Sequence, residues 1–260
     1  MTDQPQPTKK ERREAARAER IAQEQASAEA AARKKRLGIF GGLLLAAVAV
    51  VAVAIAVSSS GDDSPKAGEV AKAAEVEKLY AGIPQDGITL GDPKAKATII
   101  FFAEPKCPVC RNFDETELPG IVNKLVRTGK AKMVLRLRAF LGEDSLPAIK
   151  AYNGASLQNK MFQAVGINYA NQGDESDSWL TDERIRELLG AVEGLDADKA
   201  IKDGNGSGAE RLIAEAETLA GRYGSEGTPD VYVGKSENDA NNVDPTEASV
   251  TEAVNEIAGK

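Results

Sequence analysis

The sequence has 260 residues, no histidine and only two cysteines. Without histidine, neither a Ser-His-Asp triad nor a Cys-His pair can form. Zinc, copper and haem sites that depend on histidine are excluded as well. Two thiols are too few for a four-thiolate zinc site within one chain. Acid–base chemistry is left to carboxylates, lysines, tyrosines and the thiols themselves, and we expect no metal.

Charge is missing from one stretch and unbalanced on either side of it. Residues 1–36 carry ten Lys/Arg and six Asp/Glu, residues 37–57 carry none, and residues 58–260 carry 23 Lys/Arg against 34 Asp/Glu. The acidic surplus of the longer part argues against nucleic-acid binding. The charge-rich N-terminal part is predicted to be a solvated tail.

The uncharged stretch Leu37–Val57 predicts a single transmembrane helix. Its 21 residues would span about 31 Å as a helix, which matches the hydrocarbon core of a bilayer. The alternative is a cleaved signal peptide, because Ala54-Ile55-Ala56 has the small residues of a cleavage site. The basic run 33–36 precedes the span, and positive residues stay in the cytoplasm. We therefore expect a single-pass protein of the cell membrane, with a retained signal-anchor helix, a cytoplasmic N-terminus and residues 58–260 outside.

Residues 58–84 are predicted to be a linker with a short helix, and residues 85–260 to be one extracytoplasmic domain. The apolar run 97–103, "ATIIFFA", predicts a strand buried on both faces. A helix follows from Pro108, interrupted at Pro119.

The rest of the domain continues this α/β pattern. Residues 130–140 alternate as a second strand, expected near a sheet edge. A strand–helix–strand unit of this kind favours a parallel sheet. Helices are expected over about 143–223, with a loop at 202–208. A short strand at Val231–Val233, a polar loop at 235–245 and a last helix complete the chain.

Both cysteines lie in "KCPVC", residues 106–110, where the first strand turns into its helix. Pro108 suits the first helical position, which places Cys107 where the helix dipole lowers the pKa of a thiol. Cys110 lies one turn further on, turned inward but close enough for a disulfide. Lys106 and Glu104 are candidates for tuning the pKa of these thiols.

This spacing predicts a pair that exchanges disulfides. One alternative is a permanent structural disulfide, although a disulfide that closes so short a loop stabilises a fold very little. The other is a metal site shared between two chains. No cofactor is expected beyond the redox-active Cys107–Cys110 disulfide.

The run from "GITLGDP" through "FFAEPKCPVCRNF" to "VLRLRAF", followed after a helical stretch by "GTPDVYVG", resembles the DsbA-like thioredoxin-fold proteins. The closest likeness within that group is to membrane-anchored bacterial thiol:disulfide oxidoreductases. The resemblance implies an α/β thioredoxin fold with a helical insertion at about 143–223. It also implies a cis Pro229 facing the cysteines, with the Thr228 backbone pairing a bound peptide. Pro108 and Val109 are further candidate substrate contacts.

The resemblance implies an oxidase, in preference to a reductase or isomerase, that acts on unfolded or cysteine-containing exported proteins. A quinone-linked membrane protein, DsbB-like or vitamin K epoxide reductase-like, would recycle it. The alternative is a non-catalytic binding or assembly factor at the membrane whose 107–110 disulfide is structural. Two positions depart from the family pattern. Val109 stands where strong oxidases tend to have histidine, and Phe101 stands where an acidic residue is frequent.

Overall fold

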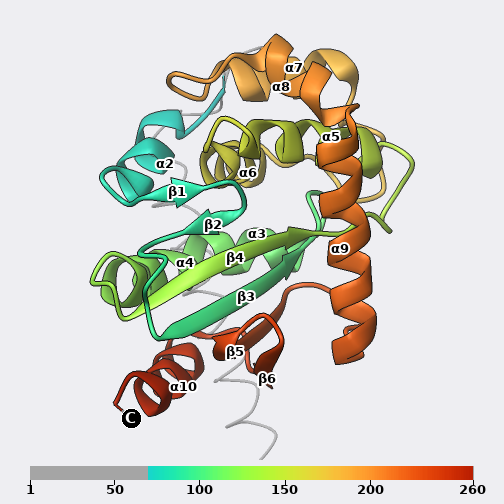
Figure 1. Cartoon of the computed structure of the whole chain (residues 1–260). Helices are drawn as coiled ribbons and strands as arrows, with labels where there is room; N and C mark the ends of the chain where they lie inside the picture. Colours follow the sequence, from blue (N-terminus) through green and yellow to red (C-terminus); the bar gives the residue numbers. More distant parts are fainter. Residues whose placement is uncertain (1–69, 260) are drawn as a thin grey trace, which may run out of the picture. The chain divides into compact units, whose positions relative to one another are not determined.

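The computed structural model describes residues 70–259. The predicted tail, residues 1–36, and the predicted transmembrane helix Leu37–Val57 lie outside this range. Among residues 70–259, no helix is both long enough and apolar enough to span a bilayer. The described residues form an α/β unit around one mixed sheet (Figure 1).

The sheet has six strands in the order β1-β2-β4-β3-β5-β6. The strands are β1 Gln85–Asp86, β2 Thr89–Leu90, β3 Ala97–Ala103, β4 Ala131–Leu137, β5 Asp230–Ser236 and β6 Asp239–Val243. Only the β3–β4 pair is parallel, as the predicted strand–helix–strand unit requires, and the other neighbours are antiparallel. The helices before the insertion are α2 Ala73–Tyr80, α3 Pro108–Thr116, α4 Leu118–Ile121 and the π-helix η1 Val122–Val126. The later helices are α5 Ser145–Ser156, α6 Met161–Ala170, α7 Asp182–Gly190, α8 Ala197–Gly204, α9 Ser207–Tyr223 and α10 Glu247–Ala258.

Strand β3 is the centre of the core, since all seven of its residues are buried. Ile99 and Phe101 belong to the large cluster that includes α3, α4, η1 and α10, and the rings of Phe101 and Phe113 meet at a tilt of 53° with their centres 4.8 Å apart. Ile100 and Phe102 face the other side, where residues of α9 cover them. Helices therefore cover both sides of the strand, as expected for a continuous apolar run. In Figure 1, α5 to α8 lie above the sheet, while α9 runs down past it.

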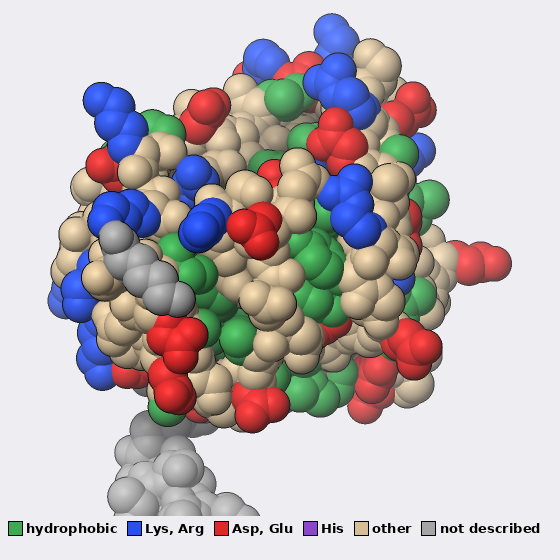
Figure 2. All heavy atoms as spheres, turned by 60° about the horizontal axis from the view of Figure 1, so that its bottom comes forward, with side chains coloured by type: hydrophobic (Ala, Val, Ile, Leu, Met, Phe, Trp, Pro, Cys, Tyr) green, Lys and Arg blue, Asp and Glu red, His purple; other side chains and the backbone are tan. Residues whose placement is uncertain are grey.

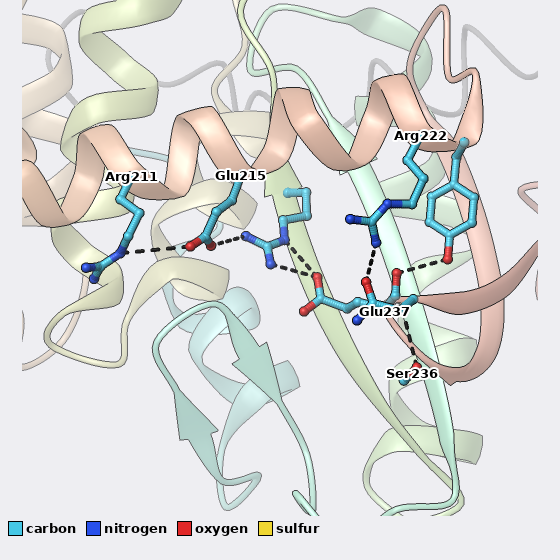
Figure 3. Close-up of polar contacts among 8 residues, drawn as sticks. Arg211, Glu215, Arg222, Ser236 and Glu237 are labelled. Carbon is cyan, nitrogen blue, oxygen red and sulfur yellow. Dashed lines mark hydrogen bonds and ion pairs between the residues drawn. The ribbon is translucent and has the colours of Figure 1, made fainter.

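The expectation that residues 130–140 lie near a sheet edge is wrong. Strand β4 is internal, between β2 and β3. The edge position was predicted because a charged residue such as Arg136 is usually exposed. Arg136 is instead only 8% exposed, and two carboxylates distant in sequence neutralise its charge. Its guanidinium lies 3.2 Å from Glu215 of α9 and 2.8 Å from Glu237 of the β5–β6 turn. Figure 3 shows Arg211 joined to Glu215 on α9, with Glu215 on the side of the helix that faces Glu237. The two ion pairs of Arg136 therefore fasten α9 to the sheet.

Two predicted loops also contain regular structure. Part of the expected loop 235–245 is strand β6, a polar edge strand that pairs with β5 through backbone hydrogen bonds. The expected loop 202–208 belongs mostly to α8 and α9. Its Gly204 is needed for helix packing, since a Cβ there would lie 2.3 Å from the carbonyl oxygen of Lys150 in α5. Glycine thus marks a close approach of two helices at this point and not a turn.

The surface of the domain mixes charges of both signs. Figure 2 shows Lys/Arg and Asp/Glu side chains spread over one face, with apolar side chains between them. Such interspersion is typical of a solvated domain surface.

Candidate functional site

The two cysteines lie at the start of α3, directly beyond the carboxyl end of β3. Cys107 is the N-cap of α3, and Pro108 occupies the first turn as predicted. The backbone N–H of Cys110 donates to Cys107 Sγ over 3.3 Å. Cys107 keeps 6% of its surface exposed and Cys110 keeps none. The pair is therefore asymmetric, with one sulfur at the surface and one inside.

The environment separates the acidities of the two thiols. The Cys110 side chain hydrogen-bonds Cys107 and, with the backbone N–H groups of Cys110 and Val109, lowers the pKa of Cys107 from 9.0 to about 6 against the opposing effect of burial. The pKa of Cys110 is raised, chiefly by burial and further by its neighbour Cys107. Near neutral pH the outer sulfur is a thiolate and the inner one a thiol, which suits nucleophilic exchange at Cys107.

A loop that is distant in sequence completes the site. The Thr228–Pro229 peptide bond is cis, which confirms the geometry implied by the resemblance. Cys107 Sγ lies 3.3 Å from the Thr228 carbonyl oxygen, to which the protonated thiol donates, so this loop lies against the outer sulfur. The Thr228 hydroxyl is buried and has no other hydrogen-bond partner, and its proximity to the sulfur lowers the pKa of Cys107. Sequence reasoning had assigned Thr228 only a backbone role.

Glu104 is fully buried beneath the cysteines. One of its carboxyl oxygens accepts from the backbone N–H of Lys106 over 2.5 Å, and the other has no partner. Burial raises the pKa of this carboxyl, while Ser145 and the backbone of Lys106 act in the opposite direction. The carboxyl is also coupled electrostatically to Cys107, and a group of this kind can hold or release a proton near the cysteine pair.

Lys106 is directed away from the sulfur. Its ammonium group is 2% exposed and lies 2.8 Å from Asp144, just before α5. The second oxygen of Asp144 accepts from the backbone N–H of Leu180. Lys106 therefore joins the cysteine turn to the helical insertion, and the hydrogen bonds that lower the pKa of Cys107 come from other groups.

The two residues between the cysteines are accessible. Pro108 and Val109 are both exposed, and Val109 is 58% exposed. They border Cys107, where a bound polypeptide would meet them, so their role as substrate contacts stays a prediction. Within residues 70–259, no group of three or more His, Cys, Asp or Glu side chains is placed to hold a metal ion.

The helical insertion contributes more to the site than the sequence indicated. Asp144 binds Lys106, Ser145 lowers the pKa of Glu104, and three residues at and just after the end of α6 bind the backbone of the cysteine turn. No motif marks any of these residues. Only the turn residue Asp144, placed just before a predicted helix, carried even a weak local signal.

Comparison with known proteins gives a consistent result. A family model described as thioredoxin matches residues 84–254. A Bacillus cereus protein named "Probable disulfide bond formation protein D" is 24% identical over 148 residues, covering 56% of this chain and 68% of that protein. The oxidised crystal structure of BdbD from Bacillus subtilis superimposes with a TM-score of 0.59 at 17% identity, over 67% of this chain and 94% of that one. A thioredoxin-like oxidoreductase from Silicibacter pomeroyi has a TM-score of 0.55 at 22% identity, over 71% and 98%.

Proposed function

Because this chain belongs to the thioredoxin family, we propose that it forms disulfides in exported, cysteine-containing proteins through Cys107 and Cys110. The chain is a protein thiol:disulfide oxidoreductase of the oxidase type. The observation that carries the proposal is the asymmetry of the pair. Cys107 keeps 6% of its surface exposed and has a pKa of about 6, while Cys110 is completely buried and has a raised pKa.

The oxidised pair accepts two electrons from the substrate. A substrate thiolate attacks Cys107 Sγ, the bond between Cys107 and Cys110 breaks, and Cys110 leaves with the electron pair and takes up a proton. The second substrate thiolate then attacks the substrate sulfur of the mixed disulfide. The substrate disulfide forms and Cys107 leaves as a thiolate. Stabilisation of that thiolate favours this last step.

The buried carboxyl of Glu104 is the candidate that exchanges a proton with Cys110. It lies beneath the pair with one oxygen unpartnered, and its pKa is raised by burial. A raised pKa brings a carboxyl closer to the range in which it both accepts and donates protons. Lys106, whose ammonium is bound to Asp144, would tune the pair only through the position of the turn.

The substrate would lie across Cys107 in an extended conformation. Thr228 and Pro229 border the sulfur on one side, and the exposed Pro108 and Val109 border it on the other. Backbone pairing with the Thr228 segment would hold any sequence, which suits an enzyme that acts on many unfolded proteins.

The place of action rests on the N-terminal sequence. The uncharged stretch Leu37–Val57 and the basic run before it support a single-pass anchor with the domain outside the cytoplasm. An oxidising compartment is where such a pair would act. Reoxidation of Cys107 and Cys110 requires an electron acceptor, for which we propose a quinone-linked protein of the same membrane.

The test compares the full chain, solubilised in a mild detergent, with Cys107→Ser and Cys110→Ser. The substrate is a reduced, unfolded protein with several cysteines. We expect the oxidised wild type to form its disulfides and Cys107→Ser not to. Cys110→Ser, supplied with thionitrobenzoate joined to Cys107 as a mixed disulfide, should release the thionitrobenzoate and form a mixed disulfide with a substrate thiol through Cys107. Equal activity of wild type and Cys107→Ser would leave the non-catalytic binding factor as the better explanation. The reduction potential, measured in glutathione buffers, then separates an oxidase from a reductase.

A further inference from the structure

Three side chains at the end of α6 hydrogen-bond the backbone carbonyls of the cysteine turn, residues 104–107. The Tyr169 hydroxyl donates to the Glu104 carbonyl over 3.0 Å. The Asn168 amide donates to the Pro105 carbonyl over 2.8 Å. The Gln172 amide donates to the Pro105 carbonyl over 2.9 Å and to the Cys107 carbonyl over 3.1 Å. The turn that presents the reactive sulfur is therefore held by an element outside the strand and helix that it connects.

This arrangement is itself rigidly supported. The three donors converge on residues 104–107 although Gln172 lies two residues beyond Ala170, the last residue of α6. Asn168 and Tyr169 are completely buried. The side-chain oxygen of Asn168 accepts from the Tyr152 hydroxyl of α5 over 2.8 Å, which fixes the orientation of the amide. These donors are neutral groups, so their contacts persist across the physiological pH range.

Gln172 is the member of this set that reaches the reactive residue itself. The Cys107 carbonyl accepts from Gln172 and also from the backbone N–H of Arg111 in the first turn of α3. That carbonyl and the Cys110 N–H that binds the sulfur belong to the same turn of backbone. A shift of a few tenths of an ångström at the carbonyl would lengthen the contact at the sulfur, and hydrogen bonds weaken steeply with poor geometry.

We propose that Gln172 is a positioning residue that holds Cys107 at the N-cap of α3, so that the helical insertion sets the reactivity of the thiolate. The proposal rests on the proposed function, since it concerns the same pair. It predicts that loss of the Gln172 amide weakens the hydrogen bonds to Cys107 Sγ, although Gln172 itself contacts the Cys107 carbonyl and not the sulfur.

The experiment measures the rate of iodoacetamide alkylation of Cys107 against pH in the reduced full chain. The variants are Gln172→Ala and Gln172→Met, the second keeping the length of the side chain without its donors. The loss of one or two net hydrogen bonds predicts an upward shift of about half to one pH unit in the midpoint, and about a two- to fivefold slower reaction at pH 6. At pH 9.5, where the thiol is ionised in every variant, the rates should agree within about twofold. The equilibrium with glutathione should shift by a similar factor, about 10–20 mV toward a weaker oxidant.

Asn171→Ala is the matched control. Asn171 is the neighbouring residue and makes three hydrogen bonds, two with the backbone of Ala71 and one with Ile167, and none with the cysteine turn. If it shifts the alkylation midpoint as far as the Gln172 variants do, the effect is general loosening and the proposal is overturned. Unshifted midpoints in both Gln172 variants overturn it as well. A wild-type midpoint near 9 would instead refute the thiolate on which the proposed function depends.

Discussion

The hydrogen bond between the two cysteine side chains can be tested by changing Cys110 alone. It is the largest contribution to the lowered pKa of Cys107, which stands at about 6 instead of 9.0. With a pKa of about 6, roughly 90% of the thiol is ionised at pH 7, which stabilises the reduced form by about 1.4 kcal/mol relative to an unshifted thiol. For a two-electron couple, that energy corresponds to about 30 mV of oxidising power.

Cys110→Ala removes the donor, whereas Cys110→Ser keeps a donor in the same place. A hydrogen bond to a charged group contributes about 1.5–3 kcal/mol, or about one to two pKa units. We therefore expect Cys107 to titrate near 7–8 in Cys110→Ala and closer to 6 in Cys110→Ser. Neither variant can form the intramolecular disulfide, so alkylation of the single thiol against pH gives the titration directly.

The pair of variants separates this hydrogen bond from the backbone contacts. At pH 6 the alanine variant should react about 5- to 50-fold more slowly than the serine variant, because the thiolate fraction sets the rate. Identical midpoints for the two variants would refute the role of the side-chain donor. Midpoints near 9 in both would refute the N-cap stabilisation as well.

Three further predictions concern groups around the pair and elsewhere in the domain. Thr228→Val removes a buried hydroxyl that has no other partner, and should raise the pKa of Cys107 by about half to one unit in the alkylation assay. Lys106→Met leaves Asp144 without its buried counter-ion, and should destabilise the domain by about 3 kcal/mol in urea unfolding; an unchanged midpoint would contradict the buried pair. Burial raises the pKa of Asp114 from 3.8 to about 7, so wild-type stability should fall as pH rises from 4 through 7, when the folded protein must give up a proton that the unfolded chain has already lost. Asp114→Asn should therefore be the more stable protein at pH 8, by roughly 2 kcal/mol, and should lose that advantage near pH 4; the reverse order would be incompatible with a raised pKa.

The centre of the fold and the chemistry of the pair were predictable from local sequence. The run 97–103 is apolar except for the β-branched Thr98 and too short for a helix, which favours a strand buried on both faces. Cys107 and Pro108 stand where a strand becomes a helix, and this position alone predicts a stabilised thiolate. Thr228-Pro229 gave only a turn signal from its own residues, and the cis geometry came from the family resemblance.

The remaining features depend on partners far away in the chain. Arg136 looks like a surface residue until Glu215 and Glu237 are brought to it by α9 and the β5–β6 turn. Strand β6 is polar and is a strand only because β5 lies beside it. Gln172 touches the cysteine turn across 65 residues of sequence. Periodicity and spacing report on neighbours along the chain, so contacts of this kind leave no local trace.

The contact between Cys107 and Thr228 has a consequence for biosynthesis. The two residues are 121 positions apart, and the whole helical insertion is made between them. While the chain is synthesised from its N-terminus, the cysteines appear long before the loop that will cover them. In a nascent or truncated chain that lacks the Thr228 loop, both thiols are therefore uncovered and can form disulfides with any other cysteine nearby. Only when the chain through β5 has been made can the Thr228 loop contact Cys107, and from then on disulfide exchange at Cys107 is selective.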